Sequence, residues 1–269
     1  MKRKRVWIVI VFILILLADG LYRAKVYRFC ADILGSPHVS PYCDSMLMQV
    51  FPLEPRFWLH GCNTVEKLQS VGQKYEGVEV DVIYYAKTDT FGVSHDREKI
   101  VSLPLDDVIG YLAKGKQKIW LDFKNLTDEN QEASRKCLNK ILARYQFDKS
   151  RIIVESNHWL ALESYTADGF YTSYYCPVED KITFCSEESM VKYMQNVQQV
   201  ARSGRVKALS CAYNYYTLVR CAASDADLLV WERNDDKWWG FYLLPSLVEI
   251  RNDEKVKVIL VWDEVYNED

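Results

Sequence analysis

Glycine, proline and histidine are scarce in this chain of 269 residues, which holds 11 Gly, 7 Pro and 4 His. So little Gly and Pro excludes a collagenous or low-complexity chain, and a hydrophobic content of 49% is that of a packed globular protein. An excess of basic residues is also missing, because 34 Lys and Arg face 37 Asp and Glu for a formal net charge of −3. We therefore expect no nucleic acid partner, since no global basic field exists to hold a phosphate backbone.

The N-terminus carries the only strongly patterned segment outside the expected domain. The basic residues Lys2–Arg5 precede the unbroken apolar run Val6–Ala18, which is shorter than the roughly 20 residues that span a bilayer. Residues 1–22 are thus predicted to be a signal peptide or a signal-anchor, with residues 23–56 a proline-rich linker and lead-in loop. Either alternative predicts export, to the periplasm or the cell exterior, and a retained anchor would attach the chain to a membrane.

Eight cysteines in an exported chain allow disulfides, although a domain of this size does not need them. The pairs close enough in sequence to close short loops are Cys30 with Cys43, Cys176 with Cys185, and Cys211 with Cys221. Spacing alone does not determine the pairing.

From Phe57 onward, short β-rich runs alternate with helical patterns, which is typical of repeated βα units around a parallel sheet. The expected strands are Phe57–His60, Val78–Tyr85, Lys118–Lys124, Arg151–Ser156, Gly169–Tyr175, Val206–Tyr213, Leu228–Arg233 and Val256–Trp262. The expected helices are Val65–Lys74, Leu105–Lys114, Asp128–Tyr145, His158–Thr166, Glu187–Ser203, Tyr215–Ser224 and Pro245–Ile250. Eight such units over residues 57–269 predict an α/β fold, a (β/α)8 TIM barrel. A doubly wound open sheet is the alternative. The dinucleotide-binding form of that sheet has no support, because no Gly-x-Gly-x-x-Gly follows a strand.

Acidic side chains stand within two neighbouring strands of the predicted barrel. Glu79 and Asp81 are two residues apart, so they point to one face while the valines between and beside them point to the other. Asp122 lies on the next strand, followed two residues later by Lys124. Carboxylates crowded inside a barrel repel unless a cation or a proton lies between them. Their oxygens predict a site for a hard divalent metal, Mg²⁺ or Ca²⁺.

Two of the four histidines flank these acids in the sequence. His60 closes the first expected strand, and His95 ends an excursion after the second. Such a pair beside a metal-bound phosphate could act as general acid and general base, and Lys124 could neutralise a phosphate oxygen. His158 is interpreted as a residue that begins a helix. Cys62 is interpreted as a small pocket-wall residue and not as a nucleophile, because nothing in the sequence pairs it with a base.

Four short motifs in this order resemble the active-site series of the glycerophosphodiester phosphodiesterases, within the superfamily of phospholipase-C-like TIM-barrel phosphodiesterases. They are His60-x-x-Asn63, Val78–Val82, Ser94–Asp96 and Leu121–Lys124. The resemblance implies His60 and His95 as the acid/base pair and Glu79, Asp81 and Asp122 as metal ligands. It implies Lys124, Asn63, Glu155 and Trp231 as substrate-binding residues.

The sequence departs from that family at two positions. Gly61 follows His60 where the family usually has Arg, and Asp122 stands where Glu is more usual. The start of the series and the Leu121–Lys124 motif look closer to the menorin-type branch of the superfamily, and the start is also similar to the sphingomyelinase D type.

These patterns predict a metal-dependent phosphodiesterase that acts on a glycerophosphodiester or a phospholipid headgroup, as a hydrolase or as a lyase that forms a cyclic phosphate. The rival hypothesis is an inactive barrel that serves as a cell-surface binding or structural protein, suggested by the missing Arg and the shorter metal ligand. The loop at residues 235–240 holds Trp238 and Trp239, a pair that could touch a membrane.

Overall fold

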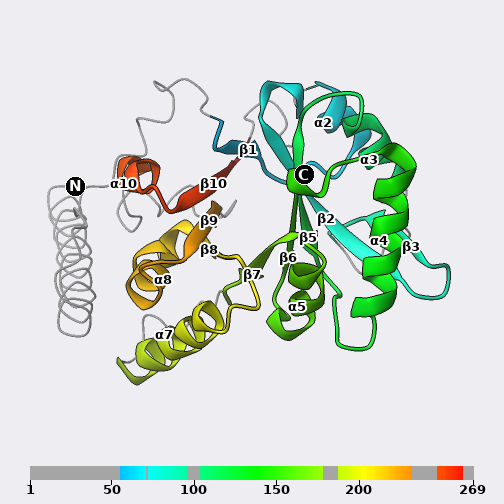
Figure 1. The fold of residues 1–269 in the computed structure, drawn as a ribbon. Helices are drawn as coiled ribbons and strands as arrows, with labels where there is room; N and C mark the ends of the chain where they lie inside the picture. The colour runs from blue at the N-terminus through cyan, green and yellow to red at the C-terminus, as the bar shows by residue number, and fades with distance from the viewer. Residues whose placement is uncertain (1–54, 71, 96–102, 178–186, 232–246, 263–269) are drawn as a thin grey trace, which may run out of the picture.

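The fold is a closed barrel of parallel strands surrounded by helices (Figure 1). The structure, a computed structural model, describes residues 55–70, 72–95, 103–177, 187–231 and 247–262. Within these residues ten strands form one sheet in the order β1-β10-β9-β8-β7-β6-β5-β2-β3-β4, and pairing of β1 with β2 closes it. Every pairing among the barrel strands is parallel, so the predicted TIM barrel is confirmed and the open doubly wound sheet is wrong.

The predicted strands and helices are all present, with ends that shift by a few residues. The barrel strands are β1 (Phe57–Leu59), β2 (Gly77–Tyr85), β5 (Lys118–Phe123), β6 (Ile152–Ser156), β7 (Tyr171–Tyr175), β8 (Ala208–Ala212), β9 (Asp227–Trp231) and β10 (Val256–Val261). The helices are α2 (Val65–Ser70), α3 (Leu105–Leu112), α4 (Gln131–Tyr145), α5 (Trp159–Ala167), α7 (Glu187–Arg202), α8 (Tyr216–Ala222) and α10 (Leu247–Asn252). Short 3-10 turns lie at Gly72–Lys74, Lys149–Arg151 and Tyr213–Tyr215.

A hairpin extends the barrel beside β2. Strand β3 (Thr90–Val93) runs antiparallel to β2, and the two-residue β4 (Leu103–Pro104) pairs with β3. The excursion expected after the second strand is therefore a real strand, and it places the residues that follow β3 next to the middle of β2. Ser94 donates its backbone N–H to the carbonyl of Asp81 at 3.0 Å.

Alternation along β2 separates the helix-facing core from the barrel interior. Val78, Val80 and Val82 are fully buried in the main hydrophobic core, which the helices cover. The opposite face points into the barrel, where an apolar cluster fills the floor. Its members are Trp58, Trp120, Ile153, Ala208, Leu229, Val258 and Leu260. This floor leaves only the upper part of the interior for polar side chains.

Gly77 makes room for Trp58, one of the two tryptophans of that floor. A Cβ atom added there would lie 2.4 Å from the Trp58 ring, so only glycine lets β2 pass this close to the indole.

One of the cysteine pairs that are close in sequence is described at both ends, Cys211 with Cys221, and it forms no disulfide. Cys211 lies near the end of β8 and Cys221 in the last turn of α8. Cys62, Cys137 and Cys176 are also buried and form no disulfide among the described residues.

Several expectations concern residues outside the described ones. These are residues 1–22, nearly all of the 23–56 linker, the Cys30 and Cys43 pair, Cys185, Asp96 and the Trp238–Trp239 pair. Among the described residues, no helix combines the length and the apolar character needed to cross a membrane.

Candidate active site

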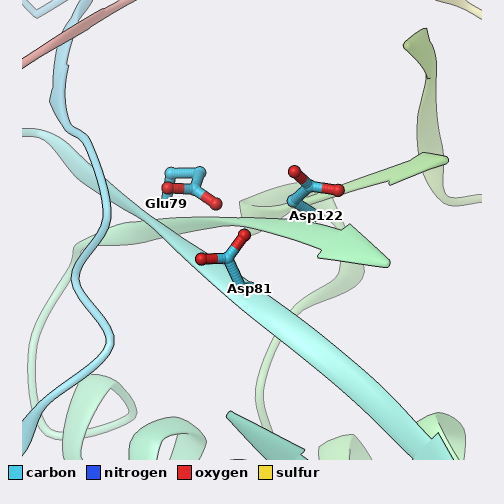
Figure 2. Close-up of side chains that lie close together, drawn as sticks. All are labelled: Glu79, Asp81 and Asp122. Carbon is cyan, nitrogen blue, oxygen red and sulfur yellow. The ribbon is translucent and has the colours of Figure 1, made fainter. Parts of the chain in front are cut away.

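Three carboxyl groups converge inside the barrel from two neighbouring strands (Figure 2). Glu79 and Asp81 share the inward face of β2, and the β2–β5 register places Asp81 directly opposite Asp122. Each residue offers one oxygen, and these oxygens all lie within 4.8 Å of one another. Glu79 and Asp81 are only 3% and 5% exposed, and acidic side chains are seldom buried this deeply unless a cation compensates their charge.

The cost of crowding these acids appears in their pKa values. Burial, with the charges of Asp81 and Asp122, raises the pKa of Glu79 well above its usual range. Burial and the charge of Asp81 likewise raise the pKa of Asp122, although the Lys124 ammonium opposes that rise. A cation placed among the three groups would relieve both effects. The residues present therefore fit a hard divalent metal, which prefers oxygen ligands in such a cluster.

Lys124 is the basic residue of this cluster. It follows β5 directly, and its backbone N–H is fixed on the carbonyl of Val82 at 3.0 Å. Its Nζ lies 2.5 Å from Asp81 Oδ1 and 2.5 Å from Asp122 Oδ2. Burial disfavours the charged ammonium, but the surrounding carboxylates outweigh that effect and raise the pKa of Lys124. Lys124 therefore carries its positive charge at all physiological pH values.

His60 stands at the edge of the acidic cluster, where β1 ends. Its Nε2 lies 3.9 Å from Glu79 Oε2, and its ring packs on Trp262 with centroids 4.2 Å apart. The next residue, Gly61, donates its N–H to the same Glu79 oxygen at 2.7 Å. Gly61 adopts φ +62, and a Cβ there would approach Trp262 to 3.2 Å. Glycine at this position thus lets the backbone bind Glu79 where the resembling family usually carries an arginine.

Asn63 holds Asp81 in place. Its Nδ2 donates to Asp81 Oδ2 at 2.5 Å, while its Oδ1 accepts the backbone N–H of Asp81 at 2.9 Å. Asn63, predicted to bind substrate, therefore contacts Asp81, which is a predicted metal ligand. Two hydrogen bonds between one pair of residues fix the carboxylate orientation.

His95 reaches the site on the hairpin that follows β2. It is exposed and comes two residues after β3 ends. Its electrostatic interaction with Asp122 opposes, to a small extent, the rise in the pKa of that carboxyl group. His60 and His95 therefore both border the cluster of Glu79, Asp81 and Asp122, although they are distant in sequence.

Glu155 and Trp231 lie on other walls of the barrel. Glu155 pairs with Asp122 across β5 and β6, is 2% exposed, and lies outside the group of three converging acids. Burial, followed by the charge of Asp122, raises its pKa well above the usual range. Trp231 closes β9, stacks on Tyr175 at 5.5 Å and meets the His60 ring edge-on at 6.4 Å.

Sequence reasoning missed two residues that shape the site. Trp262 follows β10 directly and packs on His60, and Lys67 donates to the His60 carbonyl at 3.0 Å with its Nζ 5.2 Å from the Trp262 ring centre. The position of Trp262 at a strand end was a usable signal. Lys67 gave none, because a lysine in an amphipathic helix is usually solvated.

Another sequence interpretation, that His158 begins a helix, is confirmed. His158 caps the N-terminus of α5, where its Nδ1 accepts the N–H of Ala161 at 3.4 Å. Cys62 is 1% exposed, and burial raises the pKa of its thiol to about 12, so it is not a thiolate nucleophile at neutral pH.

Comparison with known proteins yields matches among solved structures. No protein-family model matches the chain, and no curated protein matches it significantly. The structure of a candidate glycerophosphoryl diester phosphodiesterase from Silicibacter pomeroyi DSS-3 matches with a TM-score of 0.53 and 13% identity, over 79% of this chain and 91% of that chain. A glycerophosphodiester phosphodiesterase from Parabacteroides distasonis matches with a TM-score of 0.49 and 12% identity, over 72% and 92%. By the first of these matches, the chain shares the barrel fold of a solved structure assigned to the glycerophosphodiester phosphodiesterases.

Proposed function

We propose that this protein is a metal-dependent phosphodiesterase that cleaves a glycerophosphodiester or a phospholipid headgroup. The observation that carries the proposal is the placement of two histidines and a lysine around three converging carboxyl groups inside a parallel barrel. Active sites of such barrels lie at the carboxyl ends of the strands, where His60 and Lys124 lie. The fold shared with the phosphodiesterase from Silicibacter pomeroyi supports the reaction class.

The carboxyl groups of Glu79, Asp81 and Asp122 would hold Mg²⁺ or Ca²⁺. A divalent ion bound there supplies Lewis acidity toward a phosphoryl oxygen. Asn63 keeps Asp81 oriented through its two hydrogen bonds. Lys124, whose Nζ contacts Asp81 and Asp122, would pair with a second phosphate oxygen.

His60 and His95 would divide the proton transfers. One histidine takes the proton of the attacking hydroxyl, and the other donates a proton to the leaving alcohol. The attacking hydroxyl belongs to water in a hydrolase and to the substrate itself in a lyase that forms a cyclic phosphate. Trp231 and Tyr175 would line the side of the pocket next to His60, with Glu155 deeper in the barrel wall.

We also propose that the protein acts outside the cytoplasm, either held at a membrane by its N-terminal segment or released after cleavage of that segment. The basic residues and apolar run at the start of the sequence support this placement. A phospholipid headgroup or a glycerophosphodiester released from a membrane would be within reach there.

One observation favours a second function, a binding barrel without turnover. Lys124 already neutralises Asp81 and Asp122, so the pocket is partly balanced in charge without any metal. Retention of both histidines at the cluster favours the enzyme, because binding alone needs no acid/base pair.

The deciding experiment measures product release by the full chain from a panel of glycerophosphodiesters and lysophospholipids with Mg²⁺ or Ca²⁺. Turnover should fall by about 10²- to 10⁴-fold in His60→Ala and in His95→Ala. The matched control is His158→Ala, which removes a histidine that caps a helix and should retain turnover. Metal binding without turnover on any substrate would favour the binding barrel.

A further inference from the structure

The Lys124 ammonium lies against two of the three acids of the cluster. Its Nζ is 2.5 Å from Asp81 Oδ1 and 2.5 Å from Asp122 Oδ2. Mg²⁺ and Ca²⁺ bind carboxylate oxygens at about 2.0–2.6 Å, so the ammonium stands at ligand distance from two of the three acids. Both of these acids also belong to the group whose oxygens lie within 4.8 Å of one another.

An ammonium and a divalent ion cannot share these two oxygens. Each would lie within a few ångströms of the other, and like charges at that separation repel strongly in a partly buried site. The Lys124 side chain is 21% exposed, so it has access to the opening of the pocket. Its four-carbon stem carries rotatable bonds, while its backbone is fixed on Val82.

We propose that Lys124 is a tethered placeholder, which neutralises Asp81 and Asp122 in the metal-free protein and turns out of the cluster when a divalent ion binds. This inference rests on the proposed function, because it assumes that the three acids are a metal site. Once displaced from Asp81 and Asp122, the ammonium can turn toward an anion at the pocket opening. Lys124 therefore pairs with phosphate only after the metal has entered, which makes binding ordered, with metal before substrate.

The first test is the affinity of the full chain for Mg²⁺ and for Ca²⁺, measured by isothermal titration calorimetry without substrate. Lys124→Met removes the competing charge, so we expect the metal to bind at least about tenfold more tightly than to the wild type. The matched control is Lys118→Met, at the opposite end of the same strand, where Nζ pairs with Glu76 at 3.3 Å. It should leave the affinity unchanged. Equal or weaker binding by Lys124→Met would overturn the proposal.

A second measurement uses the wild-type chain and does not depend on the folding of a variant. Acetylation of lysine amines by an N-hydroxysuccinimide ester, followed by mass spectrometry, reports how freely each Nζ reacts. Addition of Ca²⁺ should raise the labelling rate of Lys124 severalfold and leave that of Lys118 unchanged. A Lys124 rate that does not respond to saturating Ca²⁺ would refute the displacement.

The outcomes separate this inference from the proposed function. If the wild type turns over a phosphodiester and Lys124→Met binds metal no more tightly than the wild type, the placeholder is refuted and the enzyme is kept. Tighter metal binding and faster Lys124 labelling without turnover on any substrate would keep the placeholder and refute the enzyme. If neither the wild type nor Lys124→Met binds metal, both the placeholder and the metal-dependent enzyme are refuted.

Discussion

Replacement of Asp81 by Asn should remove most of the stability that the protein gains from a divalent metal. Asn keeps an oxygen at the same place and can still accept the hydrogen bond from Asn63 Nδ2. It removes one of the three negative charges whose oxygens lie within 4.8 Å of one another. The perturbation thus tests the charge of the site with little change in its shape.

The expected magnitude follows from the charge that is lost. A divalent ion and a carboxylate about 4 Å apart attract by about 2 kcal/mol in water and about 8 kcal/mol near a protein surface. A loss near the low end, about 3 kcal/mol, weakens binding by about 100-fold. At a metal concentration of about 100 Kd the wild type gains about 2.7 kcal/mol, which for a domain of this size is about 5–11 °C in Tm. At the same concentration Asp81→Asn gains about 0.4 kcal/mol, or about 1–2 °C.

The assay is thermal unfolding followed by circular dichroism, after removal of metal with EDTA and then at stepped concentrations of Mg²⁺ or Ca²⁺. The matched control is Asp107→Asn, an exposed acid on α3, which should retain the full shift. An Asp81→Asn protein that keeps the whole wild-type shift would show that the ion binds elsewhere. A wild type that shows no shift in millimolar metal would refute the metal site itself.

Further predictions concern pH and packing. Because burial and the charge of Asp122 raise the pKa of Glu155 well above its usual value of about 4.5, its carboxyl group holds its proton more tightly in the folded state. The free energy of unfolding in EDTA should therefore fall as the pH rises from about 4.5 through the raised pKa, and Glu155→Gln should reduce this slope in urea titrations at several pH values; an unchanged slope would contradict the assignment. Gly77→Ala should lower the free energy of unfolding by about 2–4 kcal/mol, because its Cβ would meet the Trp58 ring at 2.4 Å. Gly204→Ala, with φ +68 and nothing within 4 Å of the added Cβ, should cost only about 1 kcal/mol; equal losses in chemical denaturation would show that contact with Trp58 is not the cause.

The order of strands and helices could be predicted because each one has a local cause. Period-two and period-3.6 patterns reflect burial on one face, and β2 shows this clearly, with its valines in the helix-facing core and its acids inside the barrel. The acids and histidines could be named for a related reason. Buried charge is costly, so Glu79 and Asp81 within an apolar strand already indicated a special role.

Contacts between distant segments were beyond the sequence. Three contacts depend on how β1, β2 and β10 meet where the barrel closes. They are the hydrogen bond of Asn63 to Asp81, the packing of Trp262 on His60, and the hydrogen bond of Lys67 to the His60 carbonyl. The cysteine pairing stayed open for the same reason, since closeness along the chain does not give closeness in space.

The sequence by itself determined the barrel, the order of its units and the set of acidic, basic and imidazole groups, because periodicity and the cost of buried charge are local properties of the chain. Tertiary structure alone decided how those groups pair. The β2–β5 register sets Asp81 opposite Asp122, and the end of β5 brings the Lys124 ammonium between them at 2.5 Å from each. Strand register and barrel closure depend on contacts between residues far apart in the sequence. They bring the charged residues together into one site in which Lys124 is the internal cation.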